Sequence, residues 1–194
     1  AGLVGYCGNL DRYQNLELLL EAFTLLLHRQ PEARLAIIGH RREAAFADRI
    51  KDRRGVEFRM AADFEQARRA MAECAVLVLP RREGSGVPIK LLNYLALGRP
   101  VVAAGCGAKL LEDGGDALLV PDGDAQAMAG AMGRLLKDRE LADRIGSAGR
   151  ASYERGLTWA TVLPELTRVY GRALDGRGQR RAGVIDSARS RIRS

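Results

Sequence analysis

The sequence predicts an α/β protein with a doubly wound parallel sheet of about six strands and helices on both faces. Short apolar runs alternate with longer segments of helical periodicity as far as residue 170, and this alternation is typical of parallel sheets whose strands are joined by helices. A chain of 194 residues is long enough to bury a sizeable core. A glycine-spaced turn also separates one apolar run from the helix that follows it, as in α/β proteins that bind phosphate.

The expected strands are short and apolar and cover residues 3–7, 34–38, 56–60, 75–79, 100–104 and 117–120. In residues 16–30, apolar side chains recur at steps of three and four, so this helix has one apolar face, and Pro31 ends it. Further helices are expected near residues 43–53, 63–73, 89–97, 109–112, 124–137, 140–154 and 158–170. Asp124 and Thr158 occupy the positions of N-caps.

The positive charge is concentrated at the C-terminus. Residues 171–194 carry seven Arg against two Asp, so they supply most of the net charge of +7. This tail is rich in Gly, Arg and Ser, and we predict one domain over residues 1–170 followed by a disordered basic tail over 171–194. The tail is either a solvated end or a weak anchor for an anionic membrane, each Arg contributing about 1 kcal/mol near a charged leaflet. We expect no nucleic-acid partner, because the domain itself is nearly neutral.

The chain contains no run close to the roughly 18 apolar residues of a membrane span, and its first residues do not resemble a secretory signal. We therefore expect a cytoplasmic protein, with a place at the inner membrane surface if the tail binds lipid. The three cysteines are widely spaced and lie in apolar segments, which favours reduced thiols over disulfides or a metal site. We expect neither a metal nor a cofactor.

Two turns carry the candidate chemistry, because ligands of open parallel sheets bind beyond the carboxyl ends of the strands. The turn after the first strand reads GNLDRYQN over residues 8–15, and the turn after the fourth reads REGSGVP over residues 82–88. Gly84 and Gly86 let backbone N–H groups approach an anion closely, at a helix N-terminus whose dipole favours negative charge.

The helix after this second turn adds two polar side chains. Lys90 lies in its first turn, where an ammonium reaches a bound phosphate, and Asn93 faces the same side. Together with the glycines they predict a diphosphate clamp. Each part also has a purely structural interpretation, as a turn glycine or a solvated helix charge. No G-x-G-x-x-G follows the first strand and no P-loop pattern is present, so neither of those nucleotide sites is supported.

With these segments, the chain resembles the C-terminal, nucleotide-sugar-binding domain of GT-B-fold glycosyltransferases of family four, which are retaining and independent of metal. The resemblance extends nearly to Tyr170 and rests on LVGYCGNLDRYQNLELLLEAF, RLAIIG, VLVLPRREGSGVPIKLLNYLALGRPVVA and EDGGDALLVPDGDAQAMAGAMGRLLKD. It implies a Rossmann-like sheet in the C-terminal half of a GT-B fold. It also implies transfer of a sugar from a nucleotide-diphosphate sugar to a glycan, lipid or small-molecule acceptor, for example in polysaccharide biosynthesis.

The resemblance further implies roles for individual residues. Glu83 corresponds to a catalytic-site carboxylate that contacts the sugar hydroxyls, and Asn93 stands where a Glu usually binds the ribose. Lys90 is the implied phosphate contact. The full implied donor-binding set is Asn9, Arg12, Gln14, Gly84, Ser85, Gly86, Val87, Lys90 and Asn93.

Besides Asn93, two further positions of this set depart from the family pattern, since Asn9 and Gln14 stand where an Arg and a Lys usually neutralise the diphosphate. Arg12, Arg82 and Lys90 are candidates to replace that charge. We interpret the chain as a divergent active branch rather than a dead enzyme, and the nucleotide base is expected against the ends of the second and third strands, near residues 39–40 and 59–61.

Because the sequence begins on the first strand of the donor half, its expected partner is a missing N-terminal acceptor domain. The isolated chain is then expected to bind donor without transferring sugar. Two alternatives stay open: a non-catalytic binding or scaffolding domain of the same fold, and one half of a nucleotide-sugar epimerase.

Overall fold

A computed structural model describes residues 2–39, 50–81, 87–105 and 110–174. Most of the expected helix over residues 43–53, and the site residues Glu83, Gly84, Ser85 and Gly86, lie outside these ranges. The chain divides into two compact units, Ala1–Tyr153 and Glu154–Ser194, and each is described by itself.

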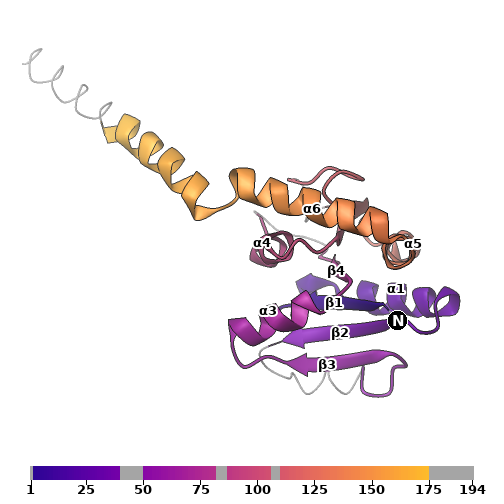
Figure 1. Cartoon of the computed structure of the whole chain (residues 1–194). Helices are drawn as coiled ribbons and strands as arrows, with labels where there is room; N and C mark the ends of the chain where they lie inside the picture. The colour runs from indigo at the N-terminus through magenta and orange to yellow at the C-terminus, as the bar shows by residue number, and fades with distance from the viewer. Residues whose placement is uncertain (1, 40–49, 82–86, 106–109, 175–194) are drawn as a thin grey trace, which may run out of the picture. The chain divides into compact units, whose positions relative to one another are not determined.

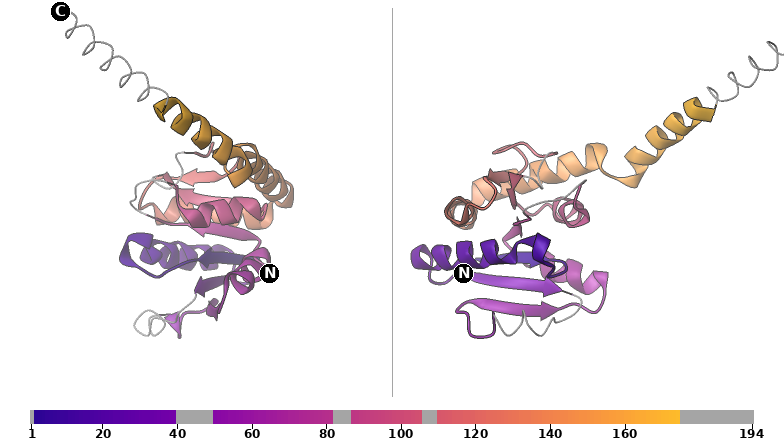
Figure 2. Two further views of the ribbon diagram at one scale, coloured as in Figure 1. Left: turned by 90° about the vertical axis from the view of Figure 1, so that its left-hand side faces the viewer. Right: turned by 180° about the vertical axis from the view of Figure 1, so that it is seen from behind.

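The first unit is built on a six-stranded parallel sheet with the strand order β3-β2-β1-β4-β5-β6 (Figures 1 and 2). The strands are β1 (Leu3–Cys7), β2 (Arg34–Gly39), β3 (Val56–Met60), β4 (Val76–Leu79), β5 (Val101–Ala104) and β6 (Leu118–Val120). Every strand begins and ends within one residue of its expected position, so the prediction of a doubly wound sheet is confirmed. The central strands β1, β4 and β5 read as unbroken apolar runs because helices cover both faces of the sheet, whereas the edge strand β3 carries Glu57 and Arg59.

The helices of this unit are α1 (Leu16–Arg29), α3 (Phe64–Ala72), α4 (Ile89–Ala96), α5 (Ala125–Lys137) and most of α6 (Arg139–Gly156), with a short 3-10 helix η1 (Arg12–Gln14) before α1. On one face, α1 and α5 pack together over alternate strand residues, among them Val4 and Tyr6. On the other face, a side chain at Gly5 would meet Cys74, just beyond α3. The Asp124 carboxylate accepts a hydrogen bond from the Ala127 N–H at 2.8 Å, which confirms the predicted N-cap of α5.

One predicted helix is absent. Residues 110–112 are not helical, so the prediction for 109–112 is wrong over these described residues. The reason is a turn over residues 110–117 that carboxylates stabilise by accepting hydrogen bonds from backbone N–H groups. Asp116 accepts from the Glu112 N–H and Asp113 from the Leu119 N–H, both at 2.8 Å. Gly114 then turns the chain at φ +70°.

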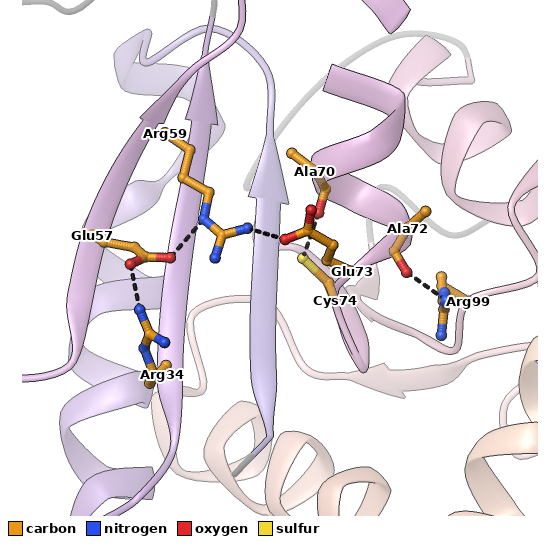
Figure 3. Close-up of polar contacts among 8 residues, drawn as sticks. All are labelled: Arg34, Glu57, Arg59, Ala70, Ala72, Glu73, Cys74 and Arg99. Carbon is orange, nitrogen blue, oxygen red and sulfur yellow. Dashed lines mark hydrogen bonds and ion pairs between the residues drawn. The ribbon is translucent and has the colours of Figure 1, made fainter. Parts of the chain in front are cut away.

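Charged side chains tie α3 to the edge of the sheet (Figure 3). The Arg59 guanidinium, on β3, donates to Glu57 on the same strand at 2.6 Å and to Glu73 after α3 at 2.7 Å. Glu57 also accepts from Arg34 at 2.6 Å. Exposed ion pairs stabilise a protein by only about 0–1 kcal/mol, so the packing of α3 on β1 and β2 matters more than these ion pairs for its place on the sheet.

The second unit contains a helix that begins at residue 159 and continues to the last described residue, 174, beyond its expected end at residue 170. The Thr158 hydroxyl accepts from the Thr161 N–H at 3.2 Å, which confirms Thr158 as an N-cap. The rest of the predicted tail, residues 175–194, lies outside the described residues, and the domain boundary at 170 stays a prediction. None of the helices in the described ranges combines the length and apolar character of a membrane span.

Candidate functional site

The candidate site lies where the strand order reverses, between β1 and β4, which is where open α/β sheets bind their ligands. The β1–β2 ladder continues to Cys7, whereas the β1–β4 ladder ends two residues earlier, at Gly5. The carboxyl ends of β1 and β4 are therefore not joined to each other. Tyr94 of α4 compensates, because its buried hydroxyl accepts from the Cys7 N–H at 2.8 Å and donates to the Cys7 carbonyl at 3.2 Å.

Lys90 extends from the first turn of α4 to this opening. Its ammonium donates to the Tyr6 hydroxyl at 2.7 Å and to the Gln14 Oε1 at 2.6 Å. Tyr6 belongs to β1 and Gln14 to η1, so one side chain joins the helix after β4 to the strand and turn on the other side of the switch point. The ammonium thus occupies the position at which a parallel sheet of this kind receives an anionic ligand.

Gly8 makes this approach possible. Its φ is +145°, a conformation that favours glycine. A Cβ at this position would lie 2.6 Å from the Lys90 Nζ. The Lys90 ammonium can therefore occupy this position only because residue 8, directly after β1, has no side chain.

Lys90, Tyr6 and Gln14 form a hydrogen-bonded cluster, and side-chain amides extend it toward the protein surface. The Gln14 Nε2 donates to the Asn9 Oδ1 at 2.8 Å, and the Asn9 Nδ2 donates to the Asp11 carboxylate and, at 3.1 Å, to the Tyr13 hydroxyl. Asn9 is exposed, whereas the Gln14 residue is only 4% exposed. Of the two amides, only Asn9 is open to a ligand.

Burial controls the protonation of this cluster. It lowers the pKa of Lys90 to about 8, with Cys7 and Asp11 opposing that shift and Arg81 adding to it. It raises the pKa of the Cys7 thiol to about 11, and it raises the pKa of the Tyr6 hydroxyl well above its ordinary value. Near pH 7 the site therefore contains one ammonium beside a neutral thiol and a neutral phenol.

A cavity of about 570 Å³ opens beside this cluster, a volume within the range of small-molecule sites. Its lining includes Cys7, Asn9, Ile38, Gly39, Ala62 and Phe64. These residues come from the carboxyl ends of β1 and β2 and from the start of α3. The cavity thus coincides with the place where the sequence predicted the nucleotide base.

Of the predicted site residues, Asn9, Gln14 and Lys90 come together. Arg12 and Val87 are exposed, and Asn93 is partly buried on α4. Within the described part of the chain, no hydrogen bond joins the Asn93 side chain to the cluster.

Sequence reasoning missed three residues of the site. Tyr6 and Tyr94 lie in apolar segments and were not singled out from the sequence, although a buried tyrosine hydroxyl usually needs a polar partner. Arg81, directly after the fourth apolar run, lies over the ring of Tyr13 at 5.5 Å from its centroid. The position of Arg81 at a strand exit was the signal that could have found it.

Comparison with known proteins identifies the family. The family model described as glycosyl transferases group 1 matches residues 1–138. The chain belongs to this family. Its sheet and helices are those of the C-terminal half of a GT-B glycosyltransferase.

Among curated relatives, this group 1 chain is 31% identical over 161 residues to a phosphatidyl-myo-inositol mannosyltransferase of Mycolicibacterium smegmatis, covering 81% of this chain and 41% of that protein. It is 28% identical over 196 residues to a D-inositol 3-phosphate glycosyltransferase of Streptomyces griseus, covering 90% and 40%. The chain therefore spans about two fifths of the length of these relatives.

Solved structures share the fold at lower identity. The C-terminal domain of a glycosyl transferase group 1 family protein from Francisella tularensis aligns with a TM-score of 0.72 at 19% identity, covering 81% of this chain and 87% of that one. Anabaena HepE in complex with UDP aligns with a TM-score of 0.73 at 19% identity, covering 88% and 48%. The first match covers most of an isolated C-terminal domain, in agreement with the half predicted from the sequence.

Proposed function

We propose that this chain is the donor-binding half of a retaining glycosyltransferase, which transfers a sugar from a nucleotide-diphosphate sugar to a glycan, lipid or small-molecule acceptor. The observation that carries the proposal is the Lys90 ammonium at the β1–β4 switch point of a group 1 glycosyltransferase domain. Relatives named as a mannosyltransferase and an inositol phosphate glycosyltransferase support this class of reaction.

The geometry supports one orientation of the donor. Its diphosphate lies against the Lys90 ammonium and the N-terminus of α4, where helix dipole and side chain both favour negative charge. The base then enters the cavity between the end of β2 and the start of α3. HepE, which shares this fold, is described in complex with UDP. The assignments of Glu83 to the sugar hydroxyls and of Asn93 to the ribose belong to this proposal.

The chemistry required of this half is mainly electrostatic. When the bond between sugar and phosphate breaks, negative charge develops on the departing diphosphate, and fixed donors stabilise it. An ammonium has three N–H donors, and the described residues accept two of them at Lys90. The third is directed to the leaving phosphate, and the exposed guanidinium of Arg12, in the turn after β1, adds further donors.

The relatives' additional length fits a second half that supplies the acceptor, because this chain spans only about two fifths of those proteins. Transfer then requires both halves, and the isolated chain binds donor without turnover.

Thermal unfolding with added nucleotides tests the proposal. We expect one of UDP, GDP and ADP to stabilise the chain by about 2.7 kcal/mol at 100 times its dissociation constant, because ligand binds only the folded state. Inorganic phosphate at the same concentration is the control for ionic effects. A chain that none of the three nucleotides stabilises is not a donor-binding domain, and the scaffold alternative then replaces this proposal.

Donor affinity should also depend on pH. The pKa of Lys90 is about 8, so its ammonium is mostly present at pH 7 and mostly lost at pH 9. Since only the charged form attracts phosphate, we expect affinity for a nucleotide-diphosphate sugar to fall about tenfold between these two pH values. Isothermal titration measures the difference, and a Lys90→Met variant should bind weakly with no such slope. An equal affinity at pH 7 and pH 9 in the wild type contradicts this assignment.

A further inference from the structure

The Gln14 side chain is almost entirely enclosed, yet it lies at the centre of the site. Gln14 is 4% exposed, and both ends of its amide have protein partners. Its oxygen accepts from Lys90 at 2.6 Å and its nitrogen donates to Asn9 at 2.8 Å. A side chain in this position orients its neighbours more readily than it contacts a ligand.

Because the Lys90 ammonium can only donate hydrogen bonds, it determines which end of the Gln14 and Asn9 amides faces it. An ammonium has no acceptor, so Gln14 must turn its oxygen toward Lys90 and its nitrogen toward Asn9. Asn9 then turns its oxygen inward and its nitrogen outward, toward the Asp11 carboxylate and the Tyr13 hydroxyl. The amide dipoles are therefore aligned between a carboxylate and an ammonium, an arrangement in which each bond strengthens the next.

Tyr6 supplies the second acceptor for the ammonium. Its hydroxyl donates to the Asn9 carbonyl at 2.6 Å, so a lone pair faces Lys90 at 2.7 Å. Its ring belongs to the core formed with α1 and α5. One acceptor is thus fixed by packing and the other by the amide chain, and together they define the direction of the remaining N–H.

We propose that Gln14 and Tyr6 are positioning residues that hold the Lys90 ammonium at the switch point, with one N–H directed at a phosphate oxygen of the donor, and that Gln14 does not contact the donor. This inference rests on the proposed function. It gives Gln14 a role different from the diphosphate contact that the family resemblance implies for its position.

The test compares Gln14→Leu and Tyr6→Phe with the wild type in titrations with UDP, GDP and ADP between pH 6.5 and pH 9.5. The charged and titratable groups that face the ammonium are Tyr6 and Cys7 of β1, Asp11 after it, and Arg81 after β4. Gln14→Leu changes none of these four groups.

Both variants should bind about tenfold more weakly at pH 7, because the ammonium is no longer held in place. The pH at which affinity is half lost should also fall by about half a unit or more, since removing an acceptor disfavours the charged form. Gln14→Glu should move that pH upward, because a carboxylate beside the ammonium favours its charge. Tyr170→Phe, the same change on an exposed tyrosine of the second unit, should match the wild type.

The outcomes separate this inference from the function on which it rests. If the wild type binds none of the three nucleotides, the proposed function fails. If the wild type binds but Gln14→Leu lowers affinity equally at every pH, Gln14 is a ligand contact and the inference fails. Tyr6→Phe preserves the ring and its packing, so this variant tests the inference if Gln14→Leu does not fold. If the pH at which affinity is half lost is the same in Tyr6→Phe as in the wild type, the inference is overturned.

Discussion

Gly146→Ala is expected to lower the free energy of unfolding by about 3 kcal/mol or more, the upper range of overpacking effects. Gly146 lies on α6, where an added Cβ would be 2.3 Å from the Gly98 carbonyl oxygen and 3.2 Å from the Pro100 nitrogen. Both are backbone atoms, which cannot rotate aside as a side chain can. Gly98 itself turns the chain at φ +64° between α4 and β5, so the close contact holds the segment that carries Lys90 against the rest of the unit.

Urea unfolding followed by circular dichroism measures this change, with Gly130→Ala as the matched control. Gly130 is also inside a helix, α5, but apart from its chain neighbours and the backbone of its own helix, none of the described residues comes within 4 Å of the position that its Cβ would take. Alanine is favoured over glycine in a helix by about 0.8–1.0 kcal/mol, so the control variant should be slightly more stable than the wild type. A Gly146→Ala protein that unfolds at the wild-type urea concentration would show that α6 moves away from this turn at little cost.

The sheet could be predicted from the sequence because its central strands, such as β4 and β5, are buried on both faces. A run such as residues 76–79 is apolar throughout and buried at every position, and such runs between amphipathic helices have few other interpretations. Local chemistry was equally readable at the caps, where a single side chain of Asp124 or Thr158 accounts for the start of a helix.

The same local reading failed where side chains compete with the helix. Over residues 110–112, composition permits a helix, but Asp113 and Asp116 bind backbone donors across the turn instead. The donor and acceptor residues are four and six positions apart. Hydrophobic periodicity in the sequence does not indicate that these hydrogen bonds form in place of a helix. Such competition depends on the conformation of the whole turn.

The sequence identified several residues of the candidate site but not the side chains with which they form hydrogen bonds. Lys90 and the polar turn after the first strand stood out, and the structure brings them together. The partners of Lys90, however, are 84 residues away at Tyr6 and 76 away at Gln14. Sequence placed Gln14 among the donor contacts, whereas η1 turns its side chain inward to 4% exposure. Contacts across a strand crossover follow from the topology, which hydrophobic periodicity reveals only in outline.

Lys90→Ala is expected to weaken nucleotide-diphosphate binding by about 1.5–3 kcal/mol, or roughly 10- to 150-fold, the range for a hydrogen bond to a charged group. The variant removes the partly buried cation at the switch point and leaves the helix N-terminus and the cavity in place. Calorimetric titration at pH 7 measures the loss. Lys137→Ala removes the same charge from an exposed position on α5 and should bind like the wild type, which separates a local effect from a change in net charge.

The free energy of unfolding of the Lys90→Ala variant shows whether Lys90 serves ligand binding or the stability of the fold. Burial lowers the pKa of Lys90 from 10.5 to about 8, so the unfolded chain binds more protons than the folded one between about pH 8 and pH 10.5. The stability of the wild type should therefore rise with pH through this window, which means that the charged form opposes folding at neutral pH. In the Lys90→Ala variant, the loss in the free energy of unfolding should then be smaller than the loss in the free energy of nucleotide binding. A lysine retained only for structure would show the opposite result: a clear loss of stability, with nucleotide affinity unchanged.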